Sequence, residues 1–343
     1  MIAKKLSKIF IVLAIAAQIL VLAYMAGKRE LIIAKGTEIY IRSAPIDPRD
    51  PFRGDFVRLR YDINAIHQNQ TKANDFPENK IPAGTTVYAV LQENENSIYS
   101  LDQLTTQRPE NGLYIKGRAS NDWRFRQNVS LQHTTVKYGI EQYYVQQGKG
   151  IEMEDRLGSR NGLQVPLEMR IALGSDGTPV IKGHRWSSLG IQLEFIRPAT
   201  TRRNENEALV SPVIKISLKN VSDQNLTLFN PGDNCAFGLY WASGDASGTR
   251  ADEACKINPA NENDFIVLEP NAEYSTELDL SLARWHVQQD GKILEVGALT
   301  SWQNFRVIYT APKREAVKDY TGQYPFWYGD LPSSRFSASG RID

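Results

Sequence analysis

An apolar run close to the N-terminus sets the strongest constraint on how this chain can fold. Residues 9–26 are apolar apart from Gln18, three lysines precede them, and the polar stretch Gly27-Lys28-Arg29-Glu30 follows. A helix rises about 1.5 Å per residue, so this run spans about 27 Å, enough to cross the hydrocarbon core of a bilayer. The sequence therefore predicts one transmembrane helix over residues 9–26, anchored in a lipid bilayer.

A cleaved signal peptide is the alternative to an anchor. Cleavage after Ala26 would place Tyr24 where a small residue is needed, and cleavage after Ala16 would leave apolar residues 19–26 on the mature protein. We therefore favour an uncleaved anchor. Because the basic residues before the span slightly outnumber those just after it, we expect residues 1–8 in the cytoplasm. The C-terminal bulk would then lie outside the inner (cytoplasmic) membrane, in a periplasmic or extracellular position.

The chain as a whole has an ordinary globular composition. Of its 343 residues, 41% are hydrophobic and 23% are charged, which excludes a largely disordered protein and leaves room for two domains. The net charge is +1 and the basic residues are spread along the chain, so we expect no nucleic-acid partner. Two cysteines are too few for a four-cysteine zinc site.

Alternating apolar and polar residues predict strands in two successive units. In the first unit, residues 31–185, the strand-like runs are 31–34, 37–41, 85–91, 113–117, 129–138, 169–173 and 179–181, with a hairpin turn at 174–177. In the second unit, residues 186–343, they are 214–219, 265–268, 274–282 and 305–309. The polar residues 198–207 are either a linker or a loop inside the second unit. We expect a mainly β protein: a transmembrane helix, then two antiparallel β-rich domains, the second an immunoglobulin-like sandwich.

The stretch 45–61, P-I-D-P-R-D-P-F-R-G-D-F-V-R-L-R-Y, joins turn residues directly to a strand. Its three prolines restrict the backbone, which predicts a stiff loop up to Gly54. In the strand that follows, residues 57, 59 and 61 share one face, and Arg58 and Arg60 share the other. The Asp and Arg side chains either hold the loop on the sheet or form a recognition surface for a partner membrane protein. The candidate interaction residues are Asp47, Arg49, Asp50, Arg53, Gly54, Asp55, Arg58, Arg60 and Tyr61.

The segment Gly54-Asp55-Phe56-Val57-Arg58-Leu59-Arg60-Tyr61 resembles the signature of the GDYXXLXY family of membrane-anchored bacterial proteins. The V-Y-A-V-L run, the D-G-T-P-V-I-K hairpin and residues 138–150 resemble the same family, so the resemblance covers roughly residues 1–185. It implies the topology given above and a multi-spanning membrane protein as partner, and it implies no reaction. Phe56 stands where the motif has Tyr, and Gln147 where the family often has an acid, so that hydroxyl and that carboxylate are missing here.

No residue pattern points to a catalytic group, a cofactor or a metal ion. The four histidines are scattered, without the spacing of metal ligands. Ser43 and Lys80 invite comparison with hydrolases that use a Ser nucleophile and a Lys base, but their spacing to Gly54-Asp55 differs. We therefore interpret Ser43 as a solvated residue at the end of a strand. A membrane-bound hydrolase acting on peptide or envelope polymer is kept as an alternative function.

The second unit contains both cysteines and a dense aromatic stretch. In an oxidising compartment Cys235 and Cys255 would form a disulfide, worth about 3 kcal/mol for a loop of this size, and two buried thiols are the alternative. Residues 324–329, Y-P-F-W-Y-G, are interpreted as a closing core strand, with a carbohydrate site at Trp327 as the alternative. The leading hypothesis is a single-pass, membrane-anchored extracytoplasmic binding or assembly protein without enzymatic activity; a hydrolase and a carbohydrate-binding envelope protein are the alternatives.

Overall fold

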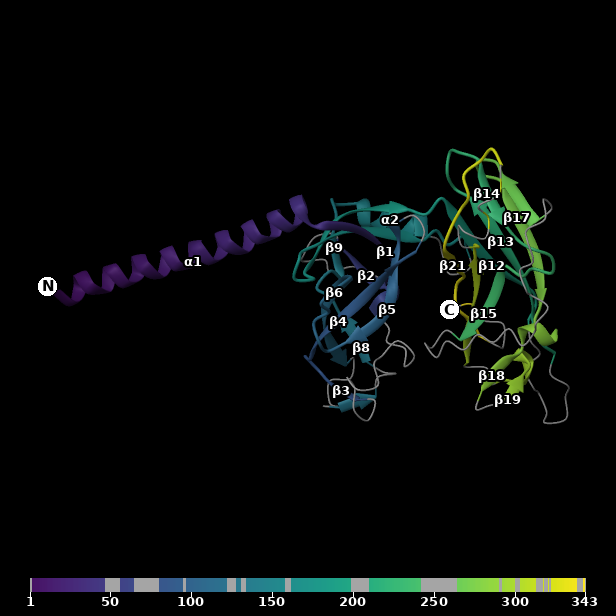
Figure 1. Ribbon diagram of the computed structural model, residues 1–343, viewed down its shortest axis with the longest axis horizontal. Coiled ribbons are helices and arrows are strands. Elements are labelled where there is room, and N and C mark those ends of the chain that lie inside the picture. Colours follow the sequence, from purple (N-terminus) through teal and green to yellow (C-terminus); the bar gives the residue numbers. More distant parts are fainter. Residues whose placement is uncertain are drawn as a thin grey trace.

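A single apolar helix projects from a body built of antiparallel strands (Figure 1). The computed structural model describes residues 2–46, 56–64, 80–94, 97–121, 128–130, 134–157, 162–198, 210–241, 264–289, 292–299, 303–312, 317, 320, 322–337 and 342. The mainly β fold with an N-terminal helix is thus confirmed. The immunoglobulin-like arrangement of the second unit stays a prediction.

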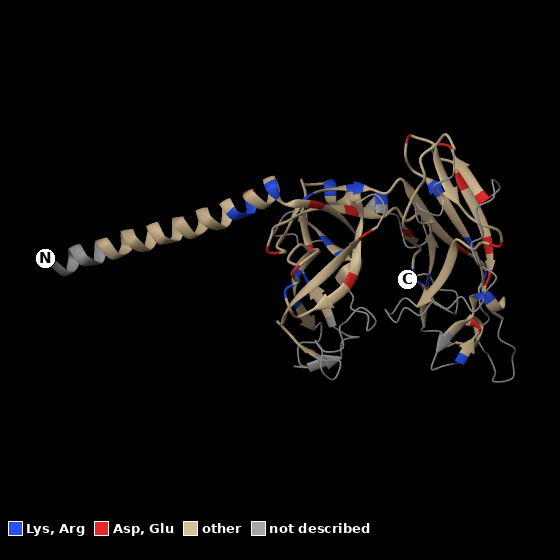
Figure 2. Ribbon diagram, in the orientation of Figure 1, with Lys and Arg blue, Asp and Glu red and all other residues tan. Residues whose placement is uncertain are grey.

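The helix α1 runs from Ile2 to Lys35 without a break. Its segment Ile9–Lys35 contains a stretch with a mean hydropathy of 2.6, none of which is buried inside the protein, so the helix is long and apolar enough to span a membrane. Figure 2 shows that, within residues 9–35, the charged residues gather at the end that meets the body. One prediction is wrong here, because residues 31–34 form the last turn of α1 and no strand. Extending an existing helix costs little, since each added residue gains a hydrogen bond without a new nucleation step.

Two sheets enclose the core of the first unit. One has the strand order β11-β10-β1-β2-β9, with β1 at Thr37–Ile46, β2 at Phe56–Tyr61, β9 at Gln142–Tyr144, β10 at Leu167–Leu173 and β11 at Pro179–Trp186. The other has the order β5-β4-β6-β8, with β4 at Thr86–Glu93, β5 at Tyr99–Thr105, β6 at Leu113–Asn121 and β8 at Thr134–Lys137. Shorter elements complete the unit: β3 at Lys80–Pro82, β7 at Asn128–Ser130, the 3-10 turn η1 at Asp62–Asn64 and the helix α2 at Lys149–Leu157.

Period-two alternation explains why these segments form strands with one buried face. Ile39 and Ile41 of β1 point into the core, as do Val87 and Ala89 of β4. The predicted strands from 37–41 to 179–181 lie within these elements or extend beyond them by one residue at most. The exception is 129–138, which divides between β7 and β8, with 131–133 outside the described residues. The hairpin at 174–177 is confirmed: Gly177 has a φ of +77°, and the Gly174 N–H donates to the Thr178 carbonyl at 2.9 Å.

The first two residues of the stiff loop predicted over 45–54 belong to a strand, and residues 47–55 lie outside the described residues. Strand β1 continues to Ile46, with Pro45 opposite Leu59 of β2. Proline lacks the N–H that a central strand position requires. Pro45 is tolerated because the pairing of β1 with β10 ends at Ser43, which leaves the proline with one neighbouring strand.

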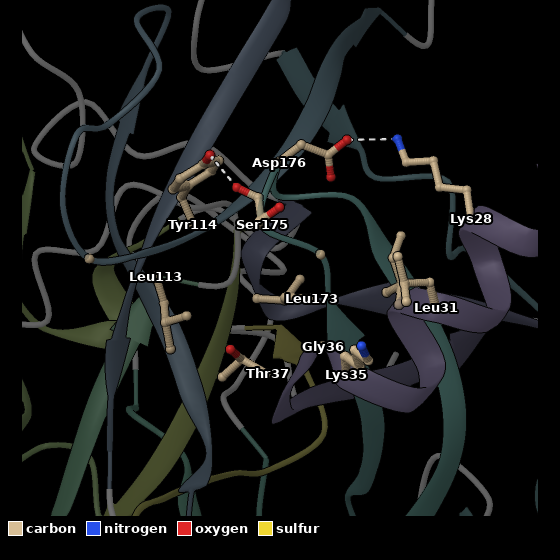
Figure 3. A pocket seen from close by; sticks show the side chains of 13 residues that line it. Lys28, Leu31, Lys35, Gly36, Thr37, Leu113, Tyr114, Leu173, Ser175 and Asp176 are labelled. Atoms are coloured by element: carbon tan, nitrogen blue, oxygen red, sulfur yellow. Dashed lines mark hydrogen bonds and ion pairs between the residues drawn. The ribbon is translucent and has the colours of Figure 1, made fainter.

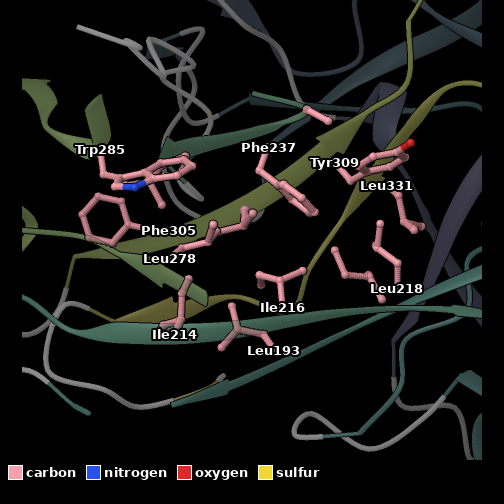
Figure 4. Packing of buried hydrophobic residues seen from close by; sticks show 14 of the residues in the cluster. Leu193, Ile214, Ile216, Leu218, Phe237, Leu278, Trp285, Phe305, Tyr309 and Leu331 are labelled. Carbon is pink, nitrogen blue, oxygen red and sulfur yellow. The ribbon is translucent and has the colours of Figure 1, made fainter. Parts of the chain in front are cut away.

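The second unit packs its strands around a separate core (Figure 4). Side chains of β13, among them Ile214 and Ile216, face Phe305 and Tyr309 of β20 across this core. The strands are β12 at Leu189–Arg197, β13 at Val213–Asn220, β14 at Leu226–Phe229, β15 at Phe237–Trp241, β16 at Phe265–Leu268, β17 at Glu273–Asp279, β18 at Val287–Gln289, β19 at Lys292–Leu294, β20 at Asn304–Thr310, β21 at Asp330–Pro332 and β22 at Phe336–Ser337. They form the ladders β12-β13-β17, β14-β16, β18-β19 and β15-β20-β21, with β22 beside β20; 3-10 turns lie at Ala283–Trp285 and Val296–Ala298.

Three expectations for the second unit are refined by this arrangement. Residues 198–207 stand in the chain between β12 and β13, which pair with each other, so they belong to the second unit and are no linker between units; 199–209 lie outside the described residues. The aromatic stretch 324–329 contributes to the core, since Trp327 is 4% exposed. It forms no strand, because its pairing is limited to a single bridge from Phe326 to Thr227. Cys235 is buried, and Cys255 lies outside the described residues.

Candidate functional site

The described part of the candidate interaction segment is the strand β2. Asp47, Arg49, Asp50, Arg53, Gly54 and Asp55 lie outside the described residues. Arg58, Arg60 and Tyr61 belong to β2, which pairs with β1 on one side and with β9 on the other. The strand is therefore held within the sheet, and the direction of each of these three side chains follows from the pleat.

The two faces of β2 differ as the alternation predicted. Arg58 and Arg60 are exposed, whereas Val57, Leu59 and Tyr61 are buried in the core of the first unit. The Tyr61 hydroxyl donates a hydrogen bond to the Ile140 carbonyl at 2.8 Å, and burial raises the pKa of Tyr61 above its ordinary value. Tyr61 thus secures the fold from inside, while Arg58 and Arg60 are the members of the set that face solvent.

Strand β9 extends the exposed face beside Arg58. Gln142 lies directly opposite Arg58 in the ladder, and both side chains are exposed. Two residues further on, Tyr144 is 64% exposed and donates a hydrogen bond to the Gln142 side chain at 3.1 Å. Arginine and tyrosine are enriched in protein interfaces because they combine large contact area with directional hydrogen bonds. This edge of the sheet therefore has the residue types of a protein contact.

The same outer face carries a ladder of charges along β1, β10 and β11. Nearest to α1, Glu38 pairs with Lys182 at 2.8 Å and with Arg170 at 3.7 Å. The hydrogen bond from Lys182 lowers the pKa of Glu38. Further from α1, Glu168 lies between Arg185 at 2.6 Å and Arg42 at 3.6 Å. Sequence reasoning missed this ladder because its members come from three strands, and only their register brings them together.

The second unit docks on the far end of that ladder. The Arg42 guanidinium lies 5.5 Å from the centre of the Trp327 ring, and the Trp327 indole N–H donates to the Ser187 hydroxyl at 3.4 Å. Gly329 has a φ of +104°, and a side chain there would begin 3.1 Å from Arg42 Nη2. A pocket of about 400 Å³ lies beside this contact, with Glu168, Arg185 and Trp327 in its wall. Ser187, Arg42 and Trp327 thus join the two units where the chain passes from β11 to β12.

Ser43 is placed where it cannot serve as an accessible nucleophile. It is 5% exposed, and its neighbours in the sheet are Leu167 on one side and Tyr61 on the other. The interpretation of Ser43 as a solvated residue at a strand end is therefore wrong, since β1 continues three residues further and is paired on both sides at this position. Among the residues that the structure describes, no group of three or more His, Cys, Asp or Glu side chains is arranged to hold a metal ion.

A second pocket, of about 460 Å³, opens where α1 meets the first unit (Figure 3). Lys28, Leu31 and Lys35 of α1 form one side, and the turn from Leu173 to Asp176 forms the other. Lys28 donates to Asp176 at 2.8 Å, and this hydrogen bond is the main cause that lowers the pKa of Asp176 to about 2. Sequence reasoning assigned residues 31–34 to a strand, so it could not have placed Lys28, Leu31 and Lys35 on one helix face.

Comparison with known proteins adds one finding. A family model described as GDYXXLXY protein matches residues 18–183. The matched region begins inside the apolar part of α1 and ends in β11, so it takes in the first β unit and the junction pocket, and it excludes the second unit. No curated protein and no solved structure matches the chain.

Proposed function

Residues 18–183 of this chain belong to the GDYXXLXY protein family, and from this premise we propose a membrane-anchored assembly protein. In this proposal α1 is an uncleaved single-pass anchor in the inner membrane, with its N-terminus in the cytoplasm. Both β units lie on the other side, in the periplasm or outside the cell. The first β unit binds a multi-spanning membrane protein through the exposed face of β2. The proposal includes no reaction.

The observation that carries the proposal is the firm attachment of α1 to the first sheet. Ile32 is buried against Ala172 and Val180, which makes a small apolar cluster at the junction. The helix ends at Lys35, and the next residue, Gly36, donates its N–H to the Ile32 carbonyl at 2.8 Å and has no room for a side chain on its Cα. A sheet held in this way has a fixed height and orientation relative to the helix. That arrangement suits a protein that presents one surface to a neighbour in the same membrane.

Arg58, Arg60 and Tyr144 are the described residues that best fit the contact. They lie on one exposed face, and that face belongs to the region matched by the family model. A hydrolase centred on Ser43 finds no support, because Ser43 is buried between paired strands. A glycan platform at Trp327 is likewise disfavoured, since this ring is covered by the core of the second unit and by Arg42.

The experiment is the purification of tagged full-length protein from its native membrane in mild detergent, followed by mass spectrometry. The test variant is Arg58→Ala with Arg60→Ala. A matched control is Lys116→Ala with Arg118→Ala, which removes two basic side chains at the same spacing from the exposed face of β6 in the other sheet. We expect a stoichiometric membrane protein with the wild type and the control, and at least a tenfold loss with the test variant, as for removal of central interface arginines. Equal recovery with both variants would overturn the role of β2.

The disulfide belongs to the same proposal because it depends on the compartment. Cys235 is buried, and no cysteine among the described residues is free. We propose that Cys235 pairs with Cys255 after export. Alkylation of the unreduced, denatured protein should leave both cysteines unmodified, and prior reduction should expose two. Two reactive thiols in the unreduced protein would argue for a reducing compartment and against the proposed topology.

A further inference from the structure

The pocket between α1 and the first β unit lies at the height of lipid headgroups if α1 spans the membrane. The apolar run ends at Ala26, and helix residues 28–31 rise about 3–8 Å beyond it. The headgroup region on each side of a bilayer is about 5–7 Å thick. The pocket therefore begins within the headgroup layer and extends away from the hydrocarbon core to Lys35 and Thr37 (Figure 3).

Its lining is amphipathic in a way that matches a lipid headgroup and its glycerol. Leu31 is more than half exposed and borders the pocket together with Leu113 and Leu173. Lys28 and Lys35 lie seven positions apart on α1, which puts them on one face of the helix, and both border the pocket. The opposite side includes the turns at Gly112 and Gly174, and a Cβ at Gly112 would meet nothing within 4 Å.

The pocket contains one more positive charge than negative charges. Lys28 is neutralised by Asp176, with which it makes an ion pair at 2.8 Å. Within the described part of the chain Lys35 makes no ion pair. The two lysines and one aspartate therefore sum to one positive charge, which complements the single negative charge of a phosphodiester. Basic side chains close to a membrane surface attract anionic lipids.

We propose that this pocket binds the phosphate headgroup of an anionic phospholipid, with the phosphate toward Lys35 and the glycerol against Leu31. The inference rests on the membrane anchoring proposed above. A lipid is favoured as the occupant because the pocket is continuous with α1, along whose apolar surface lipid chains run. Binding there would fill the open side of the junction and hold the first sheet at a fixed height above the bilayer.

The test uses full-length protein in mild detergent and counts bound lipid by native mass spectrometry. The probes are phosphatidylglycerol, the zwitterionic phosphatidylcholine, and soluble glycerol 3-phosphate, which carries the phosphate without the lipid. We expect selective binding of phosphatidylglycerol. Lys35→Gln should weaken it about fivefold, and Lys35→Arg should retain it, as the loss of one basic side chain near anionic lipid predicts.

Two further variants distinguish lipid binding in this pocket from general attraction of lipid to basic side chains. Arg29→Gln removes one positive charge from α1 at a position that does not border the pocket, so it should change binding less than about twofold. Asp176→Asn releases Lys28 from its ion pair and should strengthen binding about fivefold.

Three results would overturn the inference: equal losses for Lys35→Gln and Arg29→Gln, equal binding of phosphatidylcholine, or weaker binding by Asp176→Asn. Glycerol 3-phosphate binding as tightly as the phospholipid would identify a site for free phosphate esters instead. Carbonate extraction of native membranes tests the anchoring separately. A failure of anchoring is therefore distinguishable from a failure of lipid selectivity.

Discussion

The first β unit has two junctions, one with α1 and one with the second unit, and the ion pair at the first is exposed whereas the ion pair at the second is buried. At the α1 junction, an ion pair between Lys28 and Asp176, with side chains 44% and 40% exposed, lies beside a small apolar cluster and an open pocket. At the far end, the Glu168 and Arg42 side chains are 5% and 11% exposed, and Trp327 covers them. Exposed pairs contribute little to stability, whereas a buried charge that loses its partner is costly.

The two junctions should therefore respond differently when a side chain is removed. The far junction should behave as part of the cores of both units, because removal of the Glu168 carboxylate would leave the Arg42 guanidinium buried without an ion-pair partner. Arg42 already has two buried nitrogens, Nε and Nη2, without a hydrogen-bond partner. Its ion pair with Glu168 therefore offsets much of the free-energy cost of burying the guanidinium. The α1 junction should tolerate loss of its ion pair and depend instead on close backbone packing.

The largest effect is expected from Glu168→Ala at the far junction. This change leaves Arg42 and Arg185 facing each other without the carboxylate between them, which should lower the free energy of unfolding by about 3–5 kcal/mol. Urea unfolding followed by tryptophan fluorescence measures it, since Trp186 and Trp327 flank the cluster. Glu194→Ala, on the exposed side of β12, is the control and should change stability by less than about 0.5 kcal/mol. A loss below about 1 kcal/mol for Glu168→Ala would show that water compensates the arginines.

An intermediate effect is expected from Gly36→Ala at the α1 junction. A Cβ at this position would lie 2.5 Å from the Ile32 carbonyl oxygen and 2.8 Å from that of Leu173, and both are backbone atoms that cannot turn aside. We expect a loss of about 1–3 kcal/mol in thermal unfolding. Gly27→Ala is the matched control, because a Cβ there meets nothing within 4 Å and should favour the helix by about 0.5–1 kcal/mol. If both variants unfold like the wild type, α1 is not held by close packing at Gly36.

The smallest effect is expected from Asp176→Asn, and it should depend on pH. The pKa of Asp176 is lowered to about 2, so its ion pair with Lys28 is fully present above the ordinary aspartate pKa of 3.8 and is lost as the pH falls through about 2. The variant should therefore be less stable than the wild type at pH 5, by at most about 1 kcal/mol because both groups are exposed.

That difference should shrink as the pH is lowered from about 4 to about 2. Thermal unfolding of wild type and variant at matched pH values provides the measurement. A difference that stays constant down to pH 2 would show that it does not come from the ionised carboxylate, and therefore not from the ion pair between Asp176 and Lys28.

Short-range pattern was a good guide wherever neighbours along the chain decide the outcome. The alternation over residues 57–61 predicted which β2 side chains are exposed, and the glycines of residues 174–177 predicted the hairpin turn. The pattern failed where distant residues decide. Residues 31–34 are as suited to a strand as to a helix. They are helical because they continue α1 and because Ile32 and Ile33 pack on Ala172 and Val180. Ser43 looked like a solvated strand end because its partners Tyr61 and Leu167 are distant in sequence.

Local sequence pattern was enough to predict that α1 is long enough to span a membrane, that the body is rich in strands and that the arginines of β2 are exposed. These properties depend on hydropathy and on the helix and strand periods, which are local. Two other arrangements follow from long-range packing: Glu168 bridges two arginines, one of which lies over Trp327, and Lys28, Lys35 and Asp176 surround one pocket. Both arrangements depend on strand register and on the angle at which α1 leaves the sheet. Long-range packing sets these two quantities, and no stretch of the chain encodes them alone.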